Sequence, residues 1–257
     1  SQVIFYAIYQ AFGVNGLILL NTVVNTFSFG LLFTVAVQRA GLLIPSILFT
    51  PFLFILLDRT LIRPEMFGNL FYSLVLATMF AKKLRVVKFF FALITFVWIN
   101  LHITALFGVL AMFVVLFQDI RDTKEKRKTI ATNVLIAIFI VIALFINPYG
   151  TEGLISTITI LNKYGYAIVE NQSWLFLRDF GFPLVAHIFF GFLVVAISFF
   201  FLVARKRKPR LGELILLFAT SVLVLRFVRN EILFVYTAFL VTNFNIVSLR
   251  PRRNYFF

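Results

Sequence analysis

The chain has 257 residues, of which 61% are hydrophobic and only 13% are charged, and its mean hydropathy is +1.01. A soluble domain is about half apolar and about a quarter charged, so this sequence lacks the polar residues to cover a water-facing surface. That balance excludes a soluble enzyme, a disordered chain and a nucleic-acid-binding domain. The absence of cysteine excludes a disulfide framework and thiol chemistry.

Apolar segments follow one another along almost the whole chain, and a spanning helix needs about 20 such residues. Residues 1–12 are apolar but too short to span, which predicts a helix at the membrane interface. The pair 89–101 and 103–118 is also short, which favours tilted, broken or re-entrant helices. The pattern predicts an all-α, polytopic helical membrane protein with about nine crossings, in a single transmembrane domain over residues 1–257. The candidate spans run near 14–37, 42–57, 66–81, 89–101, 103–118, 129–147, 183–204, 211–228 and 232–249.

Basic residues predict the orientation of these helices. Most of the 24 Lys and Arg residues fall in alternate connections, so all of these connections can face the cytoplasm, as the positive-inside rule requires. The distribution is typical of a multi-pass protein of the cell (plasma or inner) membrane. The basic groups are Arg39, 82–88, 121–128, 205–210 and 250–253.

The only long connection, 148–182, is expected on the extracytoplasmic side. It follows Asn147 and opens with Pro148-Tyr149-Gly150, a turn signal that ends the preceding helix. A weakly amphipathic stretch, TEGLISTITILNKYGY, then predicts an interfacial helix. Two interpretations stay open here, a helix lying on the membrane surface and a lid over a lipid-linked substrate.

Arginines near the outer ends of the spans are the sharper functional signal. Arg63 precedes Pro64 at a predicted helix start, and Arg226 and Arg229 are three apart on a predicted helix, hence neighbours on one face. The arginine fork suits phosphate oxygens. The alternatives are pairing with Asp58, Glu65, Asp179 or Glu231 and snorkelling to the interface.

No nucleotide-binding glycine loop, zinc-protease motif or hydrolase serine motif occurs in the sequence. His102 and His187 have no carboxylate at ligand spacing, so no metal site is predicted from the protein side chains.

Six segments, in this order, carry a resemblance to a known family: SQVIFYAIYQAFGVNGL, LIRPEMFGNLFYSL, VWINLHITALFGVL, INPYG, VENQSW and LRFVRNEILF. The chain resembles multispanning GT-C glycosyltransferase-like membrane proteins of prokaryotes over essentially its whole length. The second segment is similar to their Arg-Pro-x-x-Phe pattern and the third to their Trp-x-Asn-x-His pattern. The latter pattern usually continues with Gly-Gly, where this chain has Ile103-Thr104.

The resemblance implies sugar transfer from a polyprenyl-phosphate-linked donor on the extracytoplasmic side, within the cell envelope. It also implies an N-terminal span and a first outer loop, with the main catalytic carboxylate, ahead of Ser1. An inverting transfer needs a base and a group that stabilises the departing phosphate, either Arg or a loosely held divalent cation such as Mg²⁺ or Mn²⁺. Glu170 is the expected auxiliary base, and Glu65 is expected to act as a catalytic carboxylate or to orient Arg63. The residues expected to bind the donor phosphate are Arg63, Arg226 and Arg229. Asn100 and His102 are expected to bind sugar or acceptor hydroxyls.

Two other functions stay open. One is a non-catalytic membrane scaffold subunit of a larger assembly, with other membrane proteins as partners. The other, ranked third, is a transporter of lipid-linked saccharides, which would need polar residues deep inside its spans. The few candidates for such residues are Asn21, Asn25, Ser28, Thr132 and Asn133.

Overall fold

The computed structural model describes residues 1–257 apart from 58–60, 164–168 and 249–257. These residues form helices and short connections with no strand among them, so the predicted all-α class is confirmed. Five helical segments within the described ranges are long and apolar enough to cross a membrane, whereas the count of nine crossings stays a prediction. They are Gln2–Ala40, Lys82–Leu101, Lys126–Phe145, Pro183–Ala204 and Val228–Val247.

The chain divides into two compact units. Unit 1 comprises Ser1–Leu31 and Thr60–Val169, and unit 2 comprises Leu32–Arg59 and Glu170–Phe257. Helix α1 (Gln2–Ala40) contributes its longer first part to unit 1 and its last turns to unit 2. The prediction that residues 1–257 form a single transmembrane domain is not tested by this division into compact units.

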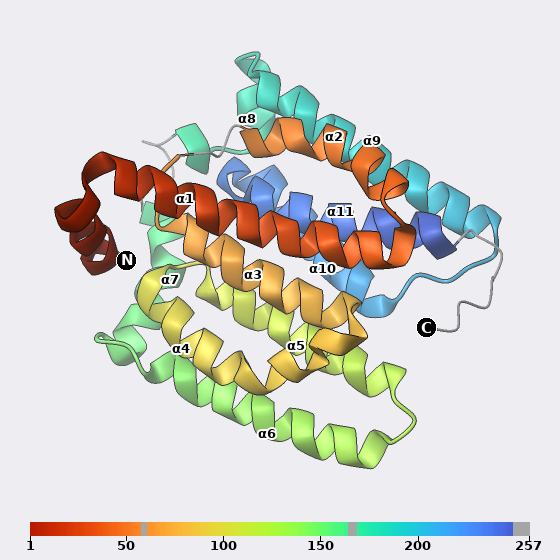
Figure 1. Cartoon of the computed structure of the whole chain (residues 1–257), viewed down its shortest axis with the longest axis horizontal. Helices are drawn as coiled ribbons and strands as arrows, with labels where there is room; N and C mark the ends of the chain where they lie inside the picture. Colours follow the sequence, from red (N-terminus) through yellow and green to blue (C-terminus); the bar gives the residue numbers. More distant parts are fainter. Residues whose placement is uncertain (58–60, 164–168, 249–257) are drawn as a thin grey trace. The chain divides into compact units, whose positions relative to one another are not determined.

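Unit 1 is built on two helix pairs, α3 with α5 and α4 with α6, which Figure 1 draws in orange to green. Apolar side chains fill the space between them, and the Trp98 ring lies against Gly108 so closely that a Cβ at position 108 would overlap it. The helices are α3 (Glu65–Phe80), η1 (Lys82–Phe90), α4 (Phe91–Leu101), α5 (Ala105–Asp122), α6 (Lys126–Phe145) and α7 (Gly150–Lys163).

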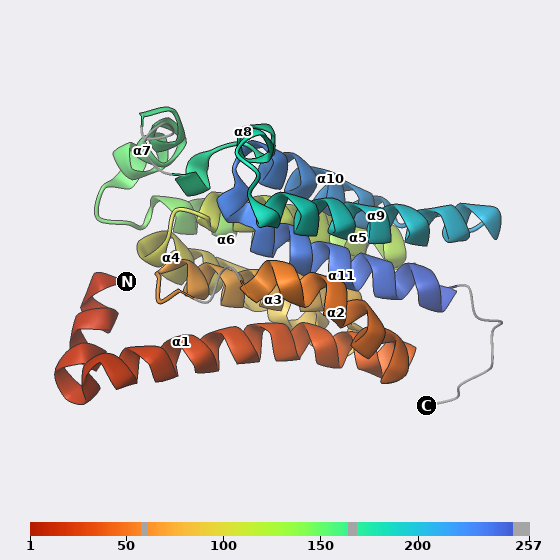
Figure 2. The ribbon, with the colours of Figure 1, turned by 90° about the horizontal axis from the view of Figure 1, so that it is seen from above.

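A single residue separates the first helical segment of unit 1 from the rest of α1. Gly13 has φ +61°, a left-handed conformation that glycine adopts without steric cost. The segment before it turns away from the axis of α1 (Figure 2) and packs Phe5 against Phe67, with ring centroids 6.1 Å apart. The predicted short helix before residue 13 is therefore a distinct segment, and its place at a membrane interface stays a prediction.

The expected span at 89–101 begins earlier than its apolar residues indicate. The 3₁₀ helix η1 leads directly into α4, so that Lys82–Leu101 forms one segment of spanning length. The charged residues of η1 point to a loop when read in sequence. Two of them have carboxylate partners on α5, which sequence reading could not supply.

Unit 2 is centred on α11, whose side chains are nearly all buried and which packs against α2, α9 and α10. Phe239 on α11 contacts Phe33 of α1 and Phe52 of α2, with ring centroids 6.3 and 6.2 Å away. The helices are α2 (Leu43–Leu57), η2 (Val169–Asn171, which begins at the last residue of unit 1), α8 (Trp174–Asp179), α9 (Pro183–Ala204), α10 (Leu211–Arg226), η3 (Val228–Asn230) and α11 (Glu231–Ser248).

Each unit has an end that we call its basic end. In unit 1 it holds residues 82–88 and 119–128, where ion pairs join η1 to the end of α5. In unit 2 it holds Arg39 and 205–210, beside the first turn of α10. The helices run from there to an opposite end, which in unit 1 holds the α4–α5 turn and in unit 2 the α10–α11 turn.

Candidate functional site

The α4–α5 turn of unit 1 places the predicted residue His102 in a small polar cluster. The Nδ1 atom of His102 lies 2.9 Å from Thr104 Oγ1 and accepts a hydrogen bond from the Thr104 backbone N–H at 3.3 Å. Trp98 Nε1 donates to the same Thr104 hydroxyl at 3.1 Å. Thr104, which stands where the resembling family has glycine, therefore links the tryptophan and the histidine of the Trp-x-Asn-x-His segment.

Helix α3 approaches this cluster at Gly68. A Cβ at that position would lie 2.5 Å from Thr104 Oγ1 and 3.2 Å from Trp98 Nε1, so only glycine permits the contact. Gly68 is in the first turns of α3, just after the half-buried Arg63 and Glu65. The Arg-Pro-x-x-Phe and Trp-x-Asn-x-His segments therefore lie at the same end of unit 1.

Pro64 immediately precedes α3, which confirms the helix start that the sequence predicts there. Its fixed φ, here −56°, suits the entry of a helix, and Glu65 in the first turn complements the positive end of the helix dipole.

Asn100 ties the end of α4 to the end of α6. Its Nδ2 group donates to the Phe96 carbonyl at 2.7 Å and to the Ile146 carbonyl at 3.0 Å. Asn147 then closes the chain into a turn, because its Oδ1 accepts the Tyr149 N–H at 2.9 Å. The predicted turn after α6 is confirmed, and α7 supplies the helix expected in the long connection.

The structure corrects the prediction that Arg226 and Arg229 share one helical face. Arg226 is the last residue of α10, Phe227 is extended with φ −142° and ψ 101°, and Arg229 belongs to the separate 3₁₀ turn η3. The Val228 N–H, freed by this break, donates to the Gln172 carbonyl at 3.1 Å. That partner is distant in sequence, so nothing local signals the break.

The two arginines make different contacts, both within unit 2. Arg229 is half-buried and its Nη1 donates to Asn171 Oδ1 at 3.0 Å. Arg226 is exposed, with its guanidinium carbon 5.5 Å from the centre of the Phe227 ring. Asp179, an alternative partner for them in the sequence interpretation, forms an ion pair with Arg178 at 2.9 Å.

Glu170, the expected auxiliary base, belongs to the short turn η2 next to Asn171. Its side chain lies outside the described part of the structure. Glu65 belongs to unit 1 and Glu170 to unit 2, so the two expected carboxylates come from different units.

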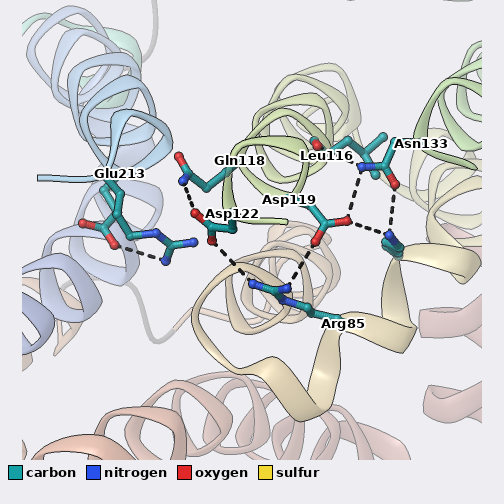
Figure 3. Close-up of polar contacts among 9 residues, drawn as sticks. Arg85, Leu116, Gln118, Asp119, Asp122, Asn133 and Glu213 are labelled. Carbon is teal, nitrogen blue, oxygen red and sulfur yellow. Dashed lines mark hydrogen bonds and ion pairs between the residues drawn. The ribbon is translucent and has the colours of Figure 1, made fainter. Parts of the chain in front are cut away.

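Sequence reading missed a network of charges at the basic end of unit 1 (Figure 3). Lys88 Nζ lies 2.6 Å from Asp119 Oδ2 and donates to Asn133 Oδ1 at 3.0 Å, while Asn133 Nδ2 donates to the Leu116 carbonyl at 2.9 Å. The side chains of Lys88 and Asp119 are only 13% and 11% exposed. The sequence places Asp119 in a hydrophilic loop, whereas its side chain lies mostly buried where η1, α5 and α6 meet.

Arg85 completes this network at its more exposed side. Its guanidinium nitrogens lie 3.5 Å from Asp119 Oδ1 and 3.4 Å from Asp122 Oδ2, and Gln118 Nε2 donates to Asp122 Oδ1 at 2.7 Å. The available sequence signal was the three-residue spacing shared by Arg85 and Lys88 on one side and by Asp119 and Asp122 on the other.

Helix α11 carries buried polar side chains that the sequence interpretation did not single out. Thr237 and Asn243 bond carbonyls of their own helix, at 2.9 and 2.8 Å, and Asn245 Nδ2 donates to Ser198 Oγ of α9 at 3.1 Å. The bond between Asn245 and Ser198 joins α11 to α9, while the other two satisfy polar side chains within α11 itself.

Within the described ranges, no three His, Asp or Glu side chains gather as a metal site. The divalent cation, Mg²⁺ or Mn²⁺, stays a prediction, and no role in the chemistry below is assigned to it.

Comparisons with protein-family models, with curated proteins and with solved structures find no match to this chain.

Proposed function

We propose that the chain is an integral-membrane glycosyltransferase of the GT-C type that uses a polyprenyl-phosphate-linked sugar. The observation that carries this proposal is the contact of Gly68 with Thr104 and Trp98, because it brings together two of the segments on which the resemblance depends. These segments lie at the end of unit 1 opposite its basic end. With the basic end of unit 1 on the cytoplasmic side of the cell (plasma or inner) membrane, these segments face the extracytoplasmic side.

The proposed reaction forms one bond and breaks another. An acceptor hydroxyl oxygen attacks the anomeric carbon of the sugar, the bond from that carbon to the phosphate oxygen breaks, and the carrier leaves as polyprenyl phosphate. The hydroxyl proton passes to a carboxylate, a role assigned to Glu170, while Glu65 orients Arg63. Asn100 and His102 bind sugar or acceptor hydroxyls.

Arg226 and Arg229 supply the charge that stabilises the departing phosphate. Arg226 is exposed, with its guanidinium carbon 5.5 Å from the centre of the Phe227 ring, and Arg229 donates to the Asn171 side chain. A phosphate can therefore approach Arg226 from solvent without displacing a described ion pair.

The test of this role is donor affinity in sugar transfer from a synthetic polyprenyl-phosphate sugar. A hydrogen bond to a charged group contributes about 1.5–3 kcal/mol, so Arg226→Ala or Arg229→Ala is expected to weaken donor binding about 10- to 100-fold. Arg226→Lys should recover part of it, because lysine keeps the charge but loses the fork. Arg178→Ala is the matched control, since Arg178 is bound to Asp179. Unchanged donor affinity in both alanine variants would overturn the assignment.

The proposed orientation with about nine crossings has its own test. Because the chain contains no cysteine, single cysteines can be introduced without a background. Lys126→Cys lies at the basic end of unit 1, and Glu152→Cys lies in α7, and both positions are exposed. A membrane-impermeant reagent should label only Glu152→Cys on intact cells. Labelling of both variants would contradict the orientation.

A non-catalytic scaffold subunit is the second candidate, and the contacts of Asn100 favour it. Its amide is engaged by two carbonyl groups, one within α4 and one at the end of α6, which is the pattern of a structural residue. Asn100→Ala should then lower stability, because it removes the bonds that join α4 to the end of α6. A wild-type protein that is folded in membranes and transfers no sugar from the synthetic donors would favour the scaffold.

A further inference from the structure

The helix η1 arranges its cations in rows, because side chains three residues apart lie in line along a 3₁₀ helix. Lys82, Arg85 and Lys88 form one row, and the last two bind Asp119 and Asp122 on α5. The ion pairs hold η1 against the end of α5. Because both carboxylates are engaged in these ion pairs, the net charge at this end is set by the other charged residues there.

The remaining charge at this end of unit 1 is strongly positive. Lys82 and Lys83 are exposed, and the neighbouring segment 121–128 adds five exposed basic residues against one further acidic residue, Glu125. This excess lies at one end of the unit because α5, α6 and η1 meet there through the Lys88 network.

A second row along η1 begins with a lysine and continues with two apolar residues. Lys83 is followed three and six residues later by Val86 and Phe89, which are 57% and 59% exposed. Exposed apolar and aromatic side chains beside lysines are typical of an element that lies in the headgroup region of a bilayer.

We propose that η1 is a binding surface for anionic phospholipid headgroups. Lys82 and Lys83 contact the headgroup phosphates, and Val86 and Phe89 enter the boundary of the acyl chains. The positive excess provides the charge complementarity, since basic residues next to a membrane span attract anionic lipid. The apolar row distinguishes a lipid from free phosphate, which would gain nothing from Val86 and Phe89.

Lipid selectivity of the full chain, reconstituted in vesicles of phosphatidylcholine and phosphatidylglycerol, tests this surface. Spin-labelled forms of the two lipids report their association with the protein by electron paramagnetic resonance. The wild type should prefer phosphatidylglycerol, and Lys82→Gln with Lys83→Gln should lower that preference about fivefold for each lysine. Lys82→Arg with Lys83→Arg should retain it, and high salt should reduce it.

A matched control removes the same charge from exposed residues of unit 2, by Arg207→Gln with Lys208→Gln. A much smaller loss of the preference for phosphatidylglycerol is expected in this variant, because the segment 205–210 that carries these two residues has no row of apolar side chains like that of η1. Phe89→Ser should weaken association of both lipids alike. A wild type without preference, or equal losses in the two double variants, would overturn the proposal. Because no donor sugar is present, these outcomes are independent of the proposed transferase activity.

Discussion

The basic end of unit 1 and the α10–α11 turn of unit 2 differ in the contacts that their cations make. At the basic end, Lys88 and Arg85 contact the carboxylates of Asp119 and Asp122. At the turn, Arg229 contacts the amide of Asn171 and Arg226 lies by the Phe227 ring. The first region pairs its cations with carboxylates, whereas the exposed Arg226 of the second region lies against an aromatic ring.

Under the proposed function, this difference separates a structural use of charge from a functional one. A mostly buried ion pair offsets its own desolvation only when both partners are present, so it fixes helix positions and leaves no charge for a ligand. An exposed cation such as Arg226 is accessible to an anion from solvent, which can form a charge-assisted contact with it. The contrast predicts that the first region governs stability and the second governs binding.

Removing one carboxylate should have the largest effect on stability. Asp119→Asn leaves Lys88, only 13% exposed, without its anion, and we expect the free energy of unfolding to fall by about 3 kcal/mol. The measurement is unfolding by sodium dodecyl sulfate in mixed micelles. Fluorescence of the fully buried Trp98 reports on unit 1 in a Trp174→Phe background.

A double variant sharpens the same prediction. Lys88→Met with Asp119→Leu removes both charges and should cost clearly less than Asp119→Asn, because no buried charge is left alone. If the double variant were as unstable as the single one, packing rather than charge pairing would account for the loss.

An intermediate effect is expected at the turn of unit 2. Asn171→Ala removes the hydrogen bond to Arg229, and because this arginine is half-buried and reaches water, the cost should be about 1 kcal/mol. Trp174 fluorescence in a Trp98→Phe background reports on unit 2, where Trp174 lies. A loss as large as that of Asp119→Asn would erase the difference between the two regions.

The smallest effect belongs to the exposed ion pair of unit 2. Arg178 and Asp179 are 55% and 63% exposed, so Arg178→Ala should change the free energy of unfolding by at most about 0.5 kcal/mol. The same unfolding assay measures it. A change above about 1 kcal/mol would mean that exposure does not decide the value of these pairs.

The helices themselves could be predicted from sequence because their signals are local. The Pro64 start of α3, the turn at Asn147 and the long apolar runs all depend on neighbouring residues. The break between Arg226 and Arg229 could not be predicted, because the backbone N–H of Val228 bonds to the carbonyl of Gln172, a residue distant in sequence. The resemblance identified the sequence segments of the candidate site. The contacts between the residues of this site are tertiary, so the sequence does not reveal them.

The network around Lys88 shows the same limit. Lysine and aspartate at positions 88 and 119 look like ordinary loop charges, and only folding brings their atoms to 2.6 Å. Sequence patterns report which surface a helix buries, whereas a buried ion pair depends on where two helices meet.

The left-handed residue in α1 has a consequence for membrane thickness. A straight helix of 39 residues would be about 58 Å long, while the hydrocarbon core of a bilayer is about 30 Å thick. Without the bend at Gly13, α1 would project far beyond the hydrocarbon core or tilt steeply within it. The bend divides α1 into a rod with a length suited to a tilted crossing and a short arm, and we predict that this arm runs along the membrane surface.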